Sequence, residues 1–236
     1  NRLMSDTTSK ALVVAPTREL AQQIEAECRD MGKGGGFTGA LLLGGMAYGP
    51  QLRDLRAKPR IVIGTPGRIK DHIEQGTLRL DQFNIVVLDE VDRMLDMGFV
   101  ADVRLLLEQL APVRQSFYFS ATMDTRVNNL IRTFSPDAEM VTVKASDTSD
   151  NVHQDVVRFG GKTEKQEKLH DILIHPDTEK AIIFEATQRS VERLEKDLQT
   201  RGFNVAAIHG GKSQAQRARA LKSFKDNQVK ILVATD

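Results

Sequence analysis

The sequence is poor in cysteine and has no long apolar run. Its single cysteine, Cys28, excludes an internal disulfide. This composition fits a reducing intracellular compartment, which we expect to be the cytoplasm, with the nucleus or an organelle as alternatives. The longest apolar runs, residues 85–88 and 181–184 among them, are about four or five residues long, whereas a helix needs about 20 apolar residues to cross a bilayer. We therefore expect no association with a membrane.

The chain also lacks an excess of charge of either sign. It carries 33 basic and 32 acidic residues, a formal net charge of +1. No basic tail or stripe indicates nucleic-acid binding by bulk electrostatics. Any such binding must come from local groups, such as backbone amides and a few arginines. The length of 236 residues favours two domains of roughly 100 residues each.

Short apolar, β-branched runs alternate with amphipathic helical patterns along the chain. Residues 145–151 (ASDTSDN) are poor in apolar side chains and rich in turn formers. They are predicted to be a linker between a first domain at residues 1–144 and a second at residues 152–236. The alternation predicts an α/β fold in which each domain is a parallel sheet with flanking crossover helices. Strands are predicted at residues 11–15, 38–43, 60–64, 85–88, 115–119, 138–143, 152–159, 180–184, 203–208 and 229–234.

Residues 85–92 (IVVLDEVD) combine a buried-type strand with three carboxylates directly after it. The apolar run suits a strand covered on both faces, and ligands of open α/β sheets bind at the carboxyl ends of strands. Asp89, Glu90 and Asp92 repel one another there, so a counter-cation is expected. A hydrated Mg²⁺ shared with substrate phosphates fits best. The alternative is an ordinary helix that starts with acidic residues.

Four other predicted loops of the first half offer amides or hydroxyls beside a helix start. They are Pro16–Leu20, Gly44–Gly45, Thr65–Arg68 and Ser120–Thr122. Helix N-termini bind anions, and the arginines add charge-assisted bonds that suit phosphate. Each loop by itself could equally be a plain helix start. Their recurrence beside the acidic residues favours a phosphate-binding edge.

Two other patterns are rejected as sites. Gly211–Ser213 resembles the end of a Walker A loop, but the required glycine five residues earlier is Ala206. Ser213 with Gln216 also forms the pattern of a capping box, which explains the serine structurally. The five histidines show no metal-ligand spacing, so we expect no zinc site.

In their order, these motifs resemble those of the DEAD-box ATP-dependent RNA helicases, a superfamily 2 family with two RecA-like domains. The resemblance covers essentially the whole chain. The matched motifs are Ia (PTREL, Pro16–Leu20), GG (Gly44–Gly45), Ib (TPGR, Thr65–Arg68), II (DEVD, Asp89–Asp92), III (SAT, Ser120–Thr122), IV (IIFEAT, Ile182–Thr187), QxxR (Gln214–Arg217) and the beginning of V (ATD, Ala234–Asp236).

The resemblance implies ATP and Mg²⁺ as cofactors. Asp89 would hold the Mg²⁺ of bound ATP through its water shell, and Glu90 would orient and deprotonate the attacking water. Asp92, also in the nucleotide site, would bond to Ser120 and Thr122 and couple nucleotide to RNA. Phosphoryl transfer requires positioning and charge neutralisation, which these roles supply.

The resemblance also implies RNA as partner, as a single strand or short duplex held by its backbone and without base reading. ATP binding and hydrolysis would then unwind short duplexes or remodel RNA–protein complexes, with protein cofactors or a ribonucleoprotein assembly as further partners. The RNA-binding residues implied are Pro16, Thr17, Arg18, Gly44, Gly45, Thr65, Pro66, Gly67 and Arg68 in the first domain and Thr187, Gln214, Arg217 and Thr235 in the second.

The sequence departs from the family pattern in three respects. Val91 replaces the usual alanine of motif II, and Glu185 places an acid in motif IV, where it is expected to weaken an RNA contact. No Q motif or Walker A loop precedes motif Ia, and no arginine-bearing motif VI follows motif V. We expect the chain to be part of a longer helicase, with both domains incomplete at their outer ends. The alternatives are an RNA-binding or assembly protein without hydrolysis and a DNA helicase of the same superfamily.

Overall fold

The computed structural model describes residues 8–32, 39–143 and 152–235. The chain divides into two compact units, Asn1–Val143 and Lys144–Asp236, and each is described by itself. The predicted linker at residues 145–151 and the glycine run at residues 33–36 lie outside the described residues.

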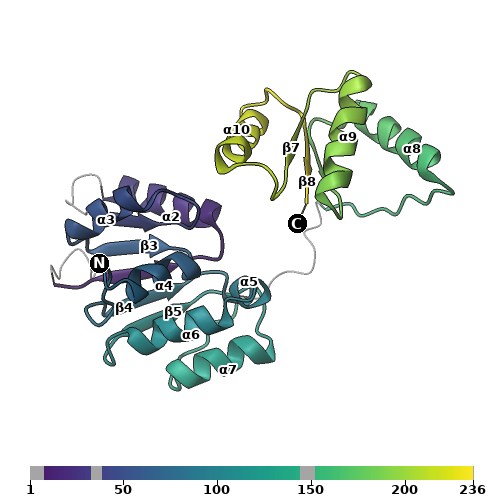
Figure 1. The fold of residues 1–236 in the computed structure, drawn as a ribbon. Coiled ribbons are helices and arrows are strands. Elements are labelled where there is room, and N and C mark those ends of the chain that lie inside the picture. Colours follow the sequence, from purple (N-terminus) through teal and green to yellow (C-terminus); the bar gives the residue numbers. More distant parts are fainter. Residues whose placement is uncertain (1–7, 33–38, 144–151, 236) are drawn as a thin grey trace. The chain divides into compact units, whose positions relative to one another are not determined.

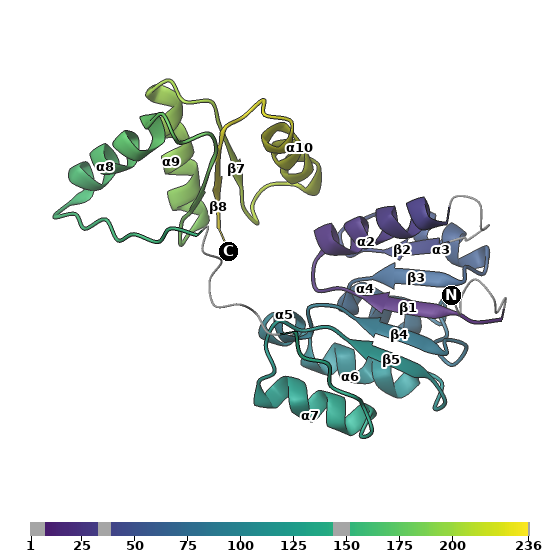
Figure 2. The same cartoon turned by 180° about the vertical axis from the view of Figure 1, so that it is seen from behind.

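The first unit contains a five-stranded parallel sheet with the strand order β2-β3-β1-β4-β5. Figure 2 shows the five strands side by side in this order. The strands are parallel because each is followed by at least one helix, which returns the chain to the other end of the sheet before the next strand begins. The strands are β1 (Ala11–Val14), β2 (Gly39–Leu42), β3 (Ile61–Gly64), β4 (Ile85–Leu88) and β5 (Gln115–Tyr118).

Apolar side chains cover both faces of this sheet. Alternate strand residues point to opposite faces, so Leu12 and Val14 belong to one core cluster while Val13 belongs to another. The larger cluster packs against α4, α5, α6 and α7, and the smaller one lies under α2. The helices of this unit, labelled in Figure 1, are α2 (Arg18–Met31), α3 (Tyr48–Arg56), α4 (Pro66–Glu74), α5 (Val91–Asp96), α6 (Val100–Gln109) and α7 (Thr125–Phe134).

The second unit is built in the same way around three parallel strands in the order β6-β8-β7. Its core joins strand residues such as Val205 and Val233 to Val191 and Leu198 on one helix face. Its elements are α8 (Lys162–Ile174), β6 (Ala181–Phe184), α9 (Gln188–Thr200), β7 (Val205–Ile208), α10 (Gln214–Lys225) and β8 (Ile231–Ala234).

Two predicted strands, at residues 138–143 and 152–159, are wrong. Both segments lack regular secondary structure in the part of the chain that the structure describes. Their β-branched composition suggested strands, but no described strand pairs with either segment. Their side chains are accordingly exposed, 84% for Val141 and 79% for Val156. Composition predicts an extended chain, whereas a strand also requires a neighbour.

Candidate functional site

The five parallel strands of the first unit end together at one edge of the sheet, called the carboxyl edge here. Val14 is level with both Gly64 and Leu88 in the strand register. Backbone hydrogen bonds continue just past the strand ends, for example from Asp89 N to Val14 O at 3.0 Å and from Thr65 N to Leu42 O at 3.1 Å. The five loops singled out in the first half therefore emerge side by side.

Asp89 and Glu90 form a tight turn between β4 and α5. The Glu90 amide donates to Asp89 Oδ1 at 3.0 Å. Glu90 has φ +50° and ψ +55°, the left-handed conformation, which costs a non-glycine residue about 1 kcal/mol or more. Its carboxylate lies 3.0 Å from Nη1 of Arg93. A strained turn that places two carboxylates after a buried strand is typical of a functional position.

These carboxylates suit a magnesium ion that arrives with a nucleotide. No cluster of three or more His, Cys, Asp or Glu side chains that could hold a metal ion is found among the described residues. A Mg²⁺ ion that keeps several waters and is shared with phosphates needs only one or two carboxylates. Asp89 and Glu90 are both partly exposed, so they can reach such an ion or its waters.

Asp92 joins the ends of β4 and β5. Its Oδ2 accepts hydrogen bonds from the amide and the hydroxyl of Thr122, each at 2.9 Å. Ser120 Oγ accepts from the Asp92 amide at 3.3 Å and donates to the Thr122 carbonyl at 2.7 Å. Burial raises the pKa of Asp92, but the hydrogen bonds from Thr122 and nearby groups outweigh this effect and hold that pKa below its usual range. The contact expected between Asp92 and the 120–122 loop is present.

Arg18 and Gly45 lie against each other at the same edge. Thr17, whose Oγ1 accepts from the Leu20 amide at 3.2 Å, caps α2 and so places Arg18 in its first turn. A Cβ on Gly45 would lie 2.5 Å from Nη2 of Arg18, and Gly45 has φ +71°. The backbone conformation therefore favours glycine, and a Cβ here would also force the Arg18 guanidinium to move.

Arg68 connects the start of α4 to the loop that contains Gly45. Its Nη1 donates to the Met46 carbonyl at 3.1 Å, its Nε lies 3.3 Å from Asp71, and its guanidinium lies 5.5 Å from the centre of the Tyr48 ring. The loops of motifs Ia, GG and Ib are thus in mutual contact. Three of the predicted RNA-binding residues are buried and therefore support the conformation of these loops: Pro16, Thr65 and Pro66.

The predicted contacts of the second unit lie around the carboxyl edge of its own sheet. Thr187 caps α9 in a capping box with Ser190. Gln214 Oε1 accepts from Arg217 Nη1 at 3.3 Å, and the Thr235 amide donates to the Ile208 carbonyl at 3.3 Å, just past β8.

Two further predictions concern the start of α10 and the acid of motif IV. The capping box of Ser213 and Gln216 is confirmed at the start of α10, which supports the rejection of a Walker A loop there. Glu185, the unusual acid of motif IV, forms an ion pair with Lys165 at 3.3 Å. The lysine offsets the negative charge that was expected to weaken RNA binding.

Sequence reasoning missed two buried polar residues behind the Gly44–Gly45 loop. Gln51 is 4% exposed and His72 is fully buried, and they contact each other. Gln51 lies on α3 and His72 on α4. The available signal was a polar residue on the inward face of each helix, which becomes meaningful once the two helices are known to be neighbours.

The chain matches two family models. The model of the DEAD/DEAH box helicase family matches residues 1–130, and that of the helicase conserved C-terminal domain matches residues 164–236. The chain is 40% identical over 234 residues to the DEAD-box ATP-dependent RNA helicase CshA of Geobacillus kaustophilus, covering 99% of this chain and 50% of that protein. Identity to the protein of the same name in Bacillus subtilis is 39% over 228 residues, covering 96% and 46%. The chain thus spans about half the length of the curated relatives it matches.

Solved structures of similar fold include S. cerevisiae Dbp5 bound to RNA and ADP BeF3, with a TM-score of 0.79 and 25% identity over 98% of this chain and 59% of that one. A DEAD box protein from the hyperthermophile Methanococcus jannaschii gives a TM-score of 0.55 and 35% identity over 96% of this chain and 61% of that one. The predicted α/β class of RecA-like sheets with flanking helices is confirmed. No helix in the described ranges is long and apolar enough to cross a membrane.

Proposed function

The chain belongs to the DEAD/DEAH box helicase family. We propose that it is part of an ATP-dependent RNA helicase that unwinds short duplexes or remodels RNA–protein complexes. One observation carries this proposal. The hydrogen bond between Asp92 and Thr122 joins the end of β4, where Asp89 and Glu90 lie, to the end of the neighbouring strand β5. The loops that hold Arg18 and Arg68 lie along the same carboxyl edge. Nucleotide and RNA would therefore occupy neighbouring positions at one edge.

On the nucleotide side, each carboxylate has its own task. Asp89 would bind the waters of a Mg²⁺ ion, and the ion when bound neutralises charge on the phosphates of ATP. Glu90 would accept the proton of the attacking water. Its strained turn and its partner Arg93 hold that carboxylate at the end of β4. We place the ATP site in residues 1–144 and the second RecA-like domain in residues 152–236, and the family-model matches at residues 1–130 and 164–236 support this division.

On the RNA side, the three connected loops would hold one strand by its phosphates. Arg18 and Arg68 supply charge, and the backbone amides of the Gly44–Gly45 loop supply further donors. Gly44 and Gly67 would add amides at the same loops. In the second unit, Thr187, Gln214, Arg217 and Thr235 would hold the same strand. Contacts to phosphates position an RNA strand without reading its bases, so low sequence specificity is expected.

A protein partner and a cellular compartment are also proposed. Dbp5 has been solved bound to Gle1 with IP6, which supports a protein cofactor for the present chain as well. The single cysteine supports a reducing compartment, with the cytoplasm the first choice.

The test replaces Glu90 by Gln in the whole protein. We expect this isosteric change to lower ATP turnover at least about a hundredfold, the scale of a lost general base, while ATP-dependent RNA binding persists. Turnover is measured as phosphate release with and without RNA. Glu108→Gln, on the exposed face of α6, is the matched control and should turn over normally. Normal turnover in Glu90→Gln would refute the role of Glu90.

The same preparations decide between the proposal and its alternatives. An RNA-binding or assembly protein without hydrolysis would bind RNA regardless of ATP and release no phosphate. A DNA helicase would separate DNA duplexes in preference to RNA duplexes. Retention of both Asp89 and Glu90 favours the enzyme, because a scaffold has no use for a general base.

A further inference from the structure

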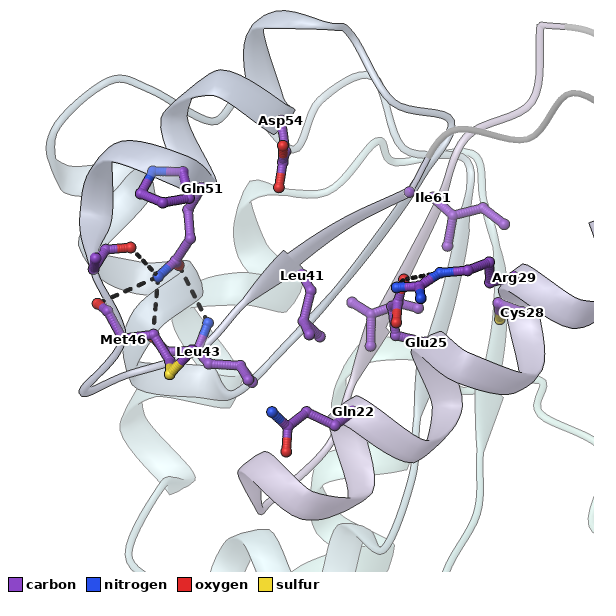
Figure 3. Close-up of a pocket in the computed structure, with 14 residues that line it drawn as sticks. Gln22, Glu25, Cys28, Arg29, Leu41, Leu43, Met46, Gln51, Asp54 and Ile61 are labelled. Atoms are coloured by element: carbon purple, nitrogen blue, oxygen red, sulfur yellow. Dashed lines mark hydrogen bonds and ion pairs between the residues drawn. The ribbon is translucent and has the colours of Figure 1, made fainter. Parts of the chain in front are cut away.

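A buried glutamine holds the Gly44–Gly45 loop from behind. The Gln51 side chain donates to the carbonyls of Leu43 at 3.2 Å and Ala47 at 3.0 Å, with a longer contact to Met46 at 3.5 Å. Its Oε1 accepts from the Leu43 amide at 3.2 Å. Figure 3 shows these bonds fanning from the one side chain to the loop. A single residue of α3 thus contacts both ends of the loop.

His72 of α4 holds this glutamine in turn. Its Nε2 lies 3.4 Å from Gln51 Oε1, and its Nδ1 lies 2.8 Å from the Thr77 hydroxyl. Gln51 Oε1 can only accept, so His72 Nε2 is the donor of that contact. The single proton of the Thr77 hydroxyl is shared between the His72 carbonyl, at 3.0 Å, and Nδ1. The ring also stacks on Tyr48, with centroids 4.3 Å apart. The network therefore connects α3, α4 and the loop.

Packing alone does not determine the conformation of this loop. A groove of about 490 Å³ opens beside it, between α2 and α3. Met46 and Ala47 line the groove and are exposed. The backbone bond from Met46 N to Leu43 O is long, at 3.4 Å. Hydrogen bonds from Gln51 supply the order that side-chain packing does not.

The Met46 carbonyl connects Gln51 to Arg68, one of the predicted RNA-binding residues. Met46 O accepts from Arg68 Nη1 at 3.1 Å and from Gln51 Nε2 at 3.5 Å. A change in the loop would displace this carbonyl and release the guanidinium. Gly45, one residue earlier, would lose its position under Arg18.

We infer that Gln51, held by His72, is a positioning residue that orders the Gly44–Gly45 loop and Arg68 for binding to the RNA backbone. This inference rests on the proposed RNA-binding function. Gln51 itself is buried and does not contact RNA. It acts through the loop amides and the Met46 carbonyl.

The test is Gln51→Met in the whole protein, which keeps the length of the side chain and removes its hydrogen bonds. We expect RNA affinity to fall about five- to tenfold, the scale of one or two hydrogen bonds. The slope of log affinity against log salt should fall by about 1, because one phosphate contact is lost. ATP hydrolysis without RNA should be unchanged.

Asn84→Leu is the matched control for loss of a polar network. Asn84 accepts from the Lys10 amide at 3.0 Å and donates to Ser9 Oγ at 3.2 Å, just before β4 begins and thus at the opposite edge of the same sheet. It should lower the melting temperature without changing RNA affinity or its salt dependence. An equal loss of affinity in Asn84→Leu and Gln51→Met would mean general destabilisation and would overturn the inference.

A double variant tests whether Gln51 acts through Arg68. If it does, the double variant Gln51→Met with Arg68→Ala should lose less RNA binding free energy than the sum of the losses in the two single variants. Fully additive losses would overturn this route. If Gln51→Met does not fold, His72→Phe keeps the ring stacked on Tyr48 and removes only its hydrogen bonds, and a smaller loss of affinity is expected.

The outcomes separate this inference from the proposed function. If the wild-type protein binds no RNA, both fail. If it binds RNA and Arg68→Ala weakens binding while Gln51→Met and His72→Phe do not, the inference alone fails.

Discussion

The two sheets carry their candidate contacts at the same kind of edge but hold them differently. In the first unit the functional loops bond to one another, as Asp92 does to Thr122 across 30 residues and Arg68 to Met46 across 22. In the second unit the caps at Thr187 and Ser213 span three residues each. A site of the first kind depends on several elements at once, whereas a cap depends mainly on its own helix. Substitutions should therefore spread their effects more widely in the first unit.

The largest effect is expected for Asp92→Ala. It removes the bond between the ends of β4 and β5 and leaves the Thr122 donors without their carboxylate. We expect a loss of about 0.5–1.5 kcal/mol of stability, because the exposed Thr122 donors can bond to water instead. We also expect ATP hydrolysis that no longer responds to RNA. Chemical denaturation and phosphate release measure the two effects. Asp96→Ala, on the same helix and paired to Arg126 at the surface, should change neither. Retained stimulation by RNA in Asp92→Ala would contradict the coupling role.

Gly45→Ala should have the next largest effect. The added Cβ would collide with Arg18, and a positive φ is unfavourable for alanine by about 1–2 kcal/mol. RNA affinity should fall by about tenfold, the scale of 1.4 kcal/mol. Gly49→Ala, where nothing lies within 4 Å of the new Cβ, is the control and should bind RNA normally. Fluorescence anisotropy with labelled RNA measures both, and equal affinities would contradict the tight contact.

Thr187→Ala tests the local character of the second unit. Loss of the N-cap should cost about 1 kcal/mol and increase amide hydrogen exchange mainly in α9. Thr187→Ser retains the capping oxygen and should restore protection. Increased exchange throughout the second unit would show that this cap also depends on tertiary contacts, against the comparison above.

The smallest effect is expected from the pH dependence of the first unit. Burial, and then the charge of Arg68, hold the pKa of His72 below its usual range, while Asp71 acts in the opposite direction. The folded state therefore favours neutral His72. Its contribution is complete above about pH 6.5, the usual histidine pKa, and is lost as pH falls toward the lowered value.

Denaturation curves between pH 5 and 8 for wild type and His72→Phe isolate this contribution, because the other histidines titrate in both. The wild type should lose more stability on acidification than the variant. Parallel curves would show that His72 is not held neutral.

Much of the fold was predictable from single segments. The strand at residues 85–88 and its carboxylates were recognised because an apolar run followed by acids needs no knowledge of neighbours. Predictions failed at residues 138–143 and 152–159, where β-branched residues were present but no described strand pairs with them. Gln51 and His72 were missed for a related reason, since each is an isolated polar residue until α3 and α4 are placed beside each other.

The sequence by itself determined the α/β alternation, the order of the motifs and the capping box at Ser213, because these depend on interactions within a few residues. Only the tertiary structure decided that Asp92 bonds to Thr122, that Arg18 lies over Gly45 and that His72 contacts Gln51. Such contacts join residues distant in the chain, and parallel strands in register bring them to one edge. There, hydrogen bonds between loops convert a set of helix starts into one candidate site.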